Sequence, residues 1–158
     1  MKIICIGRNY AEHIEELKNE RPSEPVIFMK PDTALLLKTR PFYLPNFDSQ
    51  IHHEIELVVR INHLGKNISA RFAPRYYSEI GLGVDFTARD LQDRLKQKGL
   101  PWEKAKAFDA SAPLSEEFIP TSELDLSNID FRLEVNGEVR QRGNSALMLY
   151  PINELIEH

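Results

Sequence analysis

Short apolar segments of strand length, without helices alternating regularly between them, most constrain how this chain can fold. Their β-branched and alternating residues predict strands at residues 2–6, 26–30, 53–61, 80–86, 129–135 and 138–142. Helices are predicted at about 10–19, from 87 to about 98, and after Pro151. This order favours an α+β or β-rich mixed domain over a doubly wound parallel sheet.

Turn and cap residues mark the ends of several of these segments. Asn9, with an acidic residue three positions later, has the pattern of a capping box at the start of the first helix. Thr87 is the expected N-cap of the second helix, and Gly99 is the expected residue just beyond its C-terminal end. The pair Asn136-Gly137 between two strand segments predicts a β-hairpin with a type I′ turn.

Length, charge and cysteine content narrow the class of protein. A chain of 158 residues suits one domain spanning 1–158, and a formal net charge of -4 argues against nucleic-acid binding, which needs clustered Lys and Arg. No apolar run is long enough to span a membrane, and the first strand is too short for a signal peptide. Cys5 has no second cysteine to pair with, so we expect a cytoplasmic protein with a buried, unreactive thiol.

Three acidic residues form the first candidate site. Glu54 and Glu56 are two positions apart in a predicted strand, so both carboxylates project from one face, where a hard cation could lie between them. Asp85 ends an apolar strand and could add a third oxygen ligand. Taken alone, the two glutamates fit a solvated strand face better, and Asp85 fits a turn or cap as well as a ligand. His52 shares the carboxylate face, where we expect a structural or supporting role.

Histidine and lysine side chains offer groups for acid–base chemistry and for binding an oxyanion. His13 and Glu16 lie one helical turn apart, so Glu16 could orient His13 as a base, although a core histidine explains the pattern better. Lys104 or Lys106 could reach into a cleft and stabilise an enolate, although a solvated lysine is the commoner case. Lys30 ends an apolar strand immediately before a proline, which is unusual for a free surface lysine.

Six stretches of the chain, in order, resemble successive motifs of the fumarylacetoacetate hydrolase superfamily. They are 7–13 (GRNYAEH), 28–31 (FMKP), 52–57 (HHEIEL), 85–92 (DFTARDLQ), 98–102 (KGLPW) and 106–109 (KAFD). In detail they are most similar to the acylpyruvase and oxaloacetate decarboxylase branch. Several of the motifs are long and together they span nearly the whole chain, which makes chance agreement a poor explanation.

The resemblance implies a mixed β-roll of the α+β class that forms a homodimer. Members of the superfamily continue beyond the position that matches His158. The resemblance therefore implies a catalytic domain that is incomplete at its C-terminal end. Such a chain would be a fragment, a shortened gene product, or a fold that a partner chain completes.

The resemblance also assigns roles to individual residues around a divalent metal ion, Mg²⁺ or Mn²⁺. The implied metal ligands are Glu54, Glu56 and Asp85. The implied catalytic residues are the water-activating pair His13 and Glu16, and the lysine Lys106. The residues implied to lie near the substrate are Lys30, Arg89 and Gln92.

The function implied by the resemblance is a metal-dependent hydrolase or decarboxylase that cleaves C–C bonds in small 2-oxo acids, such as acylpyruvates and oxaloacetate. An isomerase or hydratase of 2-hydroxydienoates from aromatic catabolism would use the same kind of site. The alternative from a different class is a shortened, non-catalytic remnant that binds a metal ion or a partner and turns nothing over.

Overall fold

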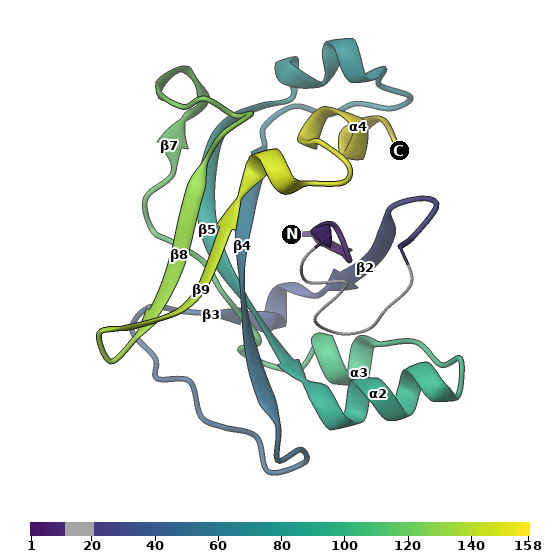
Figure 1. Ribbon diagram of the computed structural model, residues 1–158, viewed down its shortest axis with the longest axis vertical. Helices are drawn as coiled ribbons and strands as arrows, with labels where there is room; N and C mark the ends of the chain where they lie inside the picture. Colours follow the sequence, from purple (N-terminus) through teal and green to yellow (C-terminus); the bar gives the residue numbers. More distant parts are fainter. Residues whose placement is uncertain (12–20) are drawn as a thin grey trace. The chain divides into compact units, whose positions relative to one another are not determined.

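The computed structural model describes residues 1–11 and 21–158 (Figure 1). The chain divides into two compact units. The first unit comprises Met1–Cys5, Ile27–Val58 and Leu82–Glu116, and the second comprises Ile6–Val26, Val59–Gly81 and Glu117–His158. The helix predicted at about 10–19 lies almost wholly outside the described residues.

Within the described residues, the strands form small sheets. β1 (Ile3–Gly7) pairs with β2 (Val26–Lys30), and β3 (Leu35–Leu36) pairs in parallel with β6 (Ala112–Pro113). A three-stranded sheet has the strand order β4 (Ile51–Ile61), β5 (Tyr77–Ala88) and β7 (Ile119–Pro120). β8 (Asp130–Val135) is antiparallel to β9 (Glu138–Asn144). The α-helices are α2 (Arg89–Gln97), α3 (Glu103–Lys106) and α4 (Ile152–Glu157). The connections between these strands and helices also contain the short 3-10 helices η1 (Asp32–Ala34), η2 (Ala70–Arg75), η3 (Thr121–Glu123) and η4 (Ser145–Leu147). The predicted mixture of short strands and few helices is confirmed.

The N-terminal end of α2 in the first unit differs from its prediction. Thr87 does not cap the helix, because β5 continues to Ala88 and the N-cap residue makes no side-chain hydrogen bond. Instead, the loop before β4 supplies the cap: the amide of Leu91 donates to Asp48 Oδ2 at 2.7 Å. A carboxylate at this end also complements the positive end of the helix dipole.

The C-terminal end of α2 follows its prediction. Gly99 has φ +62, a left-handed conformation that glycine adopts without steric cost. The amide of Gly99 donates to the carbonyl of Lys96, and the amide of Leu100 donates to the carbonyl of Leu95. These two bonds satisfy carbonyls that the helix leaves unpaired, which is the pattern of a Schellman motif.

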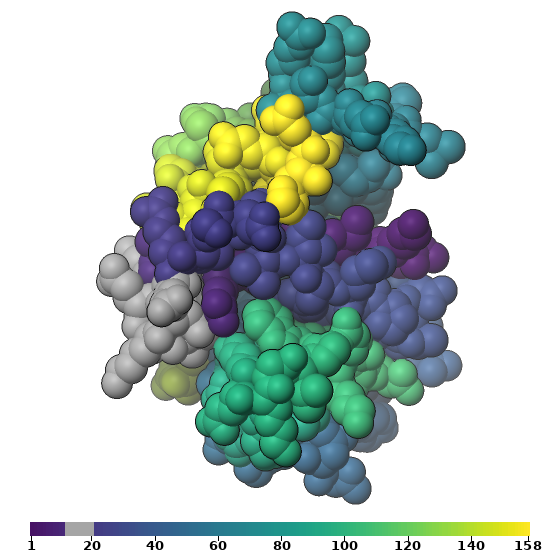
Figure 2. Space-filling model, turned by 90° about the vertical axis from the view of Figure 1, so that its right-hand side faces the viewer, coloured from purple at the N-terminus to yellow at the C-terminus, as the bar shows by residue number. Residues whose placement is uncertain are grey.

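Helices α2 and α3 pack side by side at the surface of the first unit, in green in Figure 2. Beneath them, Ala88, Leu95 and Ala105 form a small buried cluster, with partly buried Leu91 and Phe108 against it. Because this cluster joins the end of β5 to both helices, it fixes the positions of the side chains that α2 and α3 direct towards the strands.

The second unit contains the predicted hairpin of β8 and β9. Asn136 has φ 55 and Gly137 has φ 81, the two positive angles that a type I′ turn requires. Asn9 precedes the helix predicted at about 10–19, so its predicted capping role lies outside the described residues and stays a prediction. Its side-chain amide donates to the carbonyl of Tyr150 at 3.0 Å, and its Oδ1 accepts from the amide of the same residue at 2.9 Å.

Two further expectations concern the thiol of Cys5 and the presence of membrane-spanning helices. Cys5 is partly exposed, but burial and the nearby Asp85 carboxylate raise the pKa of its thiol to about 12, which keeps the thiol protonated and unreactive at neutral pH. Within residues 1–11 and 21–158, no helix combines the length and the apolar character that crossing a membrane needs.

Candidate active site

Side chains from three elements of the first unit meet in one buried cluster. β4 contributes Glu54, the C-terminal part of β5 contributes Asp85 and Thr87, and α3 contributes Lys106 at its end. Alternation along a strand puts Asp85 and Thr87 on the same face of β5. Less than a tenth of the surface of each of these residues is exposed. The carboxylate face of β4 is therefore buried at Glu54, whereas the glutamates taken alone predicted a solvated face.

The ammonium group of Lys106 lies at the centre of this cluster. Its Nζ is 2.5 Å from Glu54 Oε2, 2.7 Å from Asp85 Oδ2 and 2.6 Å from Thr87 Oγ1. Burial disfavours the charged lysine, but the attraction of Asp85 and Glu54 outweighs it and raises the pKa of Lys106 above its ordinary value. The group therefore remains a cation and a hydrogen-bond donor at neutral pH.

Lys30, at the end of β2, approaches Asp85 from the other side. Its Nζ is 2.9 Å from Asp85 Oδ1, in an ion pair between two buried side chains. Burial lowers the pKa of Lys30, and the charge of Asp85 opposes that shift in part. The two oxygens of Asp85 are thus divided between the two lysines.

Arg89, in the first turn of α2, binds the other oxygen of Glu54. Its Nη2 donates to Glu54 Oε1, its Nη1 to Gln92 Oε1 at 2.6 Å and its Nε to His52 Nδ1 at 3.3 Å. The supporting role expected for His52 agrees with this contact. Arg89 and Gln92 were predicted to lie near the substrate, and the structure brings both next to the carboxylate cluster.

Glu56 adds a third acidic group. Burial, followed by the negative charges of Asp85 and Glu54, raises its pKa from 4.5 to about 8, while Lys106 opposes that shift. The negative charges of Asp85 and Glu54 thus act on the titration of Glu56. A cation placed among them would favour the ionised form of Glu56.

The chemistry of this donor set fits a divalent cation. Mg²⁺ and Mn²⁺ take carboxylate oxygens as ligands, and Glu54 and Asp85 already share one positively charged group, the ammonium of Lys106. In the described part of the chain no group of three or more His, Cys, Asp or Glu has the spacing of a metal site. The ammonium takes the central position instead, so a metal ion bound there would require Lys106 to move aside. The assignment of the three ligands therefore stays a prediction.

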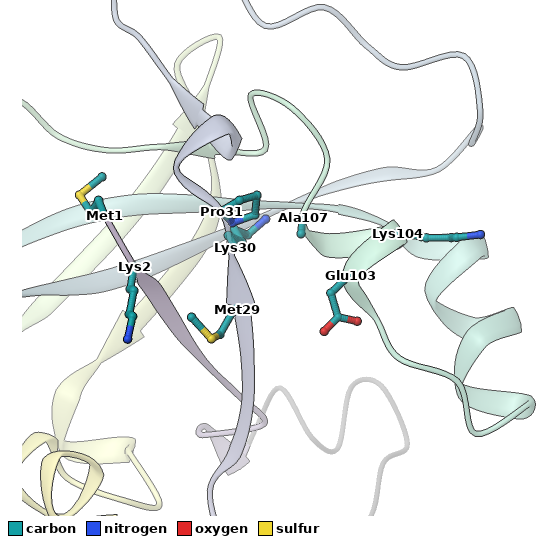
Figure 3. Close-up of a pocket in the computed structure, with 8 residues that line it drawn as sticks. All are labelled: Met1, Lys2, Met29, Lys30, Pro31, Glu103, Lys104 and Ala107. Carbon is teal, nitrogen blue, oxygen red and sulfur yellow. The ribbon is translucent and has the colours of Figure 1, made fainter.

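A shallow hollow of about 550 Å³ lies elsewhere in the same unit (Figure 3). It is lined by Met1, Lys2, Met29, Lys30, Pro31, Glu103, Lys104 and Ala107. None of the three carboxylates lines it, so it is not the candidate active site. Figure 3 shows Lys104 directed away from Met29, and Lys104 is exposed. Of the two lysines that could have reached a cleft, only Lys106 enters the carboxylate cluster.

Two residues of the cluster, Thr87 and Ser111, were not predicted from the sequence. Two predicted residues, His13 and Glu16, lie outside the described part of the chain. Thr87 was taken for a helix cap, although its position two residues after Asp85 would have placed it on the same strand face. Ser111, which donates to the carbonyl of Lys106 at 3.0 Å, carried no signal in the sequence. His13 and Glu16 lie outside the described residues, so their proposed roles stay predictions.

Comparison with known proteins identifies the family. The family described as "Fumarylacetoacetate (FAA) hydrolase C-terminal" matches residues 2–158. The oxaloacetate tautomerase FAHD1, mitochondrial, of Bos taurus is 42% identical over 157 residues, which cover 99% of this chain and 71% of the relative. The oxaloacetate tautomerase YcgM of Escherichia coli is 43% identical, with coverage of 99% and 72%. The mitochondrial oxaloacetate decarboxylase of Dictyostelium discoideum is 42% identical, with the same coverage.

Solved structures agree with this match. A fumarylacetoacetate hydrolase family protein from Yersinia pestis superposes with a TM-score of 0.93 at 45% identity, covering 99% of this chain and 72% of that one. Fumarylpyruvate hydrolase from Pseudomonas aeruginosa, solved in complex with Mn²⁺ and pyruvate, gives a TM-score of 0.88 at 34% identity, with coverage of 99% and 70%. The prediction that this chain is shorter than its relatives is confirmed by these shares. With a family match over residues 2–158 and a shared mixed α+β fold, this chain belongs to the fumarylacetoacetate hydrolase family.

Proposed function

We propose that this protein is a divalent-metal-dependent enzyme that stabilises enolates of small 2-oxo acids, and that it decarboxylates oxaloacetate or hydrolyses acylpyruvates. The observation that carries the proposal is the buried ammonium of Lys106 between Glu54 and Asp85. Relatives named oxaloacetate tautomerase and oxaloacetate decarboxylase, and a solved fumarylpyruvate hydrolase with Mn²⁺ and pyruvate, support the substrate class.

One intermediate connects the candidate reactions. Decarboxylation of oxaloacetate and C–C cleavage of an acylpyruvate both leave an electron pair on the carbon next to a keto group, which forms an enolate. A protein group that donates to the enolate oxygen as its charge develops lowers the barrier. Lys106 has the required properties, because its ammonium is buried, remains charged and is held beside the carboxylates.

The charge of the site suits an acidic substrate. With Glu56 ionised, which a nearby cation would favour, the carboxylates of Glu54, Glu56 and Asp85 contribute three negative charges, and Lys30, Lys106 and Arg89 contribute three positive charges. Without a metal these charges cancel when all six groups are ionised. A divalent cation would leave the site with two positive charges, which favours binding of a dianion such as oxaloacetate.

Each group of the site would have its own role in the reaction. A divalent metal, held by Glu54, Glu56 and Asp85, would supply Lewis acidity towards the carboxylate and keto oxygens of the substrate. Arg89 holds the far oxygen of Glu54 and thereby orients that carboxylate. Lys106 would donate a hydrogen bond to the developing enolate oxygen. His13, oriented by Glu16, is predicted to remove a proton from water in the hydrolytic reaction alone.

A second candidate activity has specific support. Two relatives with 42% and 43% identity carry the name oxaloacetate tautomerase. Interconversion of keto and enol oxaloacetate moves a proton through the same enolate, so the same lysine would serve it. The reaction breaks no C–C bond, which separates it from decarboxylation in an assay.

Replacement of Lys106 by Met is the central test. Purified full-length protein is assayed with oxaloacetate and acetylpyruvate in Mg²⁺ or Mn²⁺, and again after addition of a chelator. We expect Lys106→Met to lower kcat by about a hundredfold or more, since loss of one oxyanion donor has that order of effect. Activity should also depend on the metal.

Lys104→Met is the matched control, because Lys104 lies on the same helix but is exposed. We expect it to retain wild-type kcat. Equal losses in the two variants would contradict the role of Lys106. A folded wild type that binds Mn²⁺ but turns over neither substrate, and does not tautomerise oxaloacetate, would support the non-catalytic remnant instead.

A further inference from the structure

Lys30 is the most completely enclosed charged residue of the carboxylate cluster. Only 2% of its surface is exposed. Oxygens from three separate parts of the first unit surround its ammonium group. Besides Asp85 Oδ1 at 2.9 Å, these are Ser111 Oγ at 2.9 Å, the carbonyl of Ser111 at 3.2 Å, the carbonyl of Phe86 at 3.4 Å and the carbonyl of Lys106.

These contacts leave no part of the ammonium free for a substrate. A lysine has three N–H donors, and here five oxygens of the protein lie within reach of them. A carboxylate of a bound 2-oxo acid would have to displace oxygens that are themselves buried. Leaving those oxygens unpaired is costly, so direct substrate binding by Lys30 is disfavoured.

The contacts of Lys30 fall on the residues that carry the proposed chemistry. Its ammonium group attracts Oδ1 of Asp85, and Oδ2 of the same carboxylate lies 2.7 Å from Nζ of Lys106. Its hydrogen bond to the carbonyl of Lys106 fixes the main chain at the residue whose side chain enters the cluster. The hydroxyl of Ser111 donates a hydrogen bond to the same carbonyl at 3.0 Å.

We propose that Lys30 is a positioning residue, which orients the Asp85 carboxylate and the Lys106 main chain for cation binding and does not contact the substrate. This inference rests on the proposed function, because it assigns Lys30 to the same site. It differs from the expectation that Lys30 lies near the substrate. It also differs from a purely structural role, which would change stability alone.

The test compares metal affinity with substrate affinity in Lys30→Met. Mn²⁺ binding to the purified full chain is measured by calorimetry, and KM and kcat for oxaloacetate are measured at saturating Mn²⁺. We expect the Kd for Mn²⁺ to rise at least tenfold, because Asp85 loses its orientation. We expect KM at saturating Mn²⁺ to stay within twofold of wild type, while kcat falls. Lys104→Met is the control and should leave all three quantities unchanged.

A tenfold rise in KM at saturating Mn²⁺ with an unchanged Kd for Mn²⁺ would overturn the proposal in favour of direct substrate binding. Loss of stability without a change in Kd or kcat would overturn it in favour of a structural role. If Lys30→Met does not fold, Ser111→Ala removes a partner of both lysines. We then expect at least a threefold rise in Kd with KM unchanged, and no change in Kd would count against the proposal.

The result also separates this inference from the proposed function. A wild-type protein that binds no Mn²⁺ overturns both. A wild-type protein that binds Mn²⁺ and turns over oxaloacetate, with the same Kd and kcat in Lys30→Met, overturns only the role of Lys30.

Discussion

Buried charges are the residue-scale feature that sets this protein apart from an ordinary core. Ionised groups are expensive to remove from water unless each finds a partner. Lys106 meets two carboxylates, Arg89 meets Glu54, and Lys30 meets Asp85. Because a buried ion pair often stabilises a fold no more than apolar residues of similar volume would, we attribute the arrangement to function rather than to stability.

The titration of Glu56 yields a prediction for the metal-free protein. Its pKa rises from 4.5 to about 8 on folding, so between these values the folded protein keeps a proton that the unfolded chain has lost. The unfolded state then binds fewer protons, and the free energy of unfolding falls as pH rises from about 4.5 to about 8, by at most about 1.4 kcal/mol per pH unit. Urea unfolding at a series of pH values, with a chelator present, measures the slope.

Glu56→Gln supplies the control for this slope. The amide of Gln does not titrate in this range. We therefore expect the part of the fall in the free energy of unfolding between pH 4.5 and 8 that comes from Glu56 to disappear. Saturating Mn²⁺ should flatten the wild-type slope as well, because a nearby cation stabilises the carboxylate. Identical slopes in the metal-free wild type and Glu56→Gln would show that Glu56 is not the group responsible.

At the scale of elements, local signals placed the ends of strands and helices with mixed success. Gly99 and the Asn136-Gly137 turn follow their predictions because a positive φ is a local requirement that few residue types meet. Thr87 does not follow its prediction, because a tertiary partner takes its side chain. The hydroxyl of Thr87 accepts a hydrogen bond from Nζ of Lys106.

The turn between β8 and β9 gives a prediction about stability. Gly137 has φ 81, and a side chain there would meet no other atom within 4 Å, so only backbone strain opposes a larger residue. We expect Gly137→Ala to lower the free energy of unfolding by about 1–2 kcal/mol, the cost of a left-handed L-residue. Gly137→Asn should lose less, because Asn tolerates this region. Chemical denaturation of the three proteins measures both effects, and equal losses would contradict the strain explanation.

At the scale of the whole molecule, few large apolar side chains are fully buried. Among the described residues, the buried hydrophobic set is Ala34, Ala73, Tyr77, Ile80, Ala88, Leu95, Ala105, Ala112 and Ile152, most of them alanines. Large apolar residues such as Tyr43 and Leu44 are 81% and 75% exposed. Where such side chains gather into one patch, they favour association with another protein surface.

We therefore retain homodimer formation as a prediction for this chain. Light scattering coupled to size-exclusion chromatography should give a mass of about twice 18.3 kDa at micromolar concentration. Dilution should shift the mass towards that of one chain, since association depends on protomer concentration. A mass of 18.3 kDa at every concentration would contradict the prediction.

The sequence by itself determined what depends on neighbours in the chain. Strand alternation put Glu54 and Glu56 on one face, glycine marked the positive-φ turns, and the ordered motifs indicated the family. Tertiary structure alone decided which face of β4 is buried and which lysine enters the cluster. Lys30 meets oxygens 55 or more positions away, and Lys106 meets Glu54 across 52 positions. Burial and charge pairing of this kind arise only when distant segments pack, because no local pattern records which groups will be removed from water together.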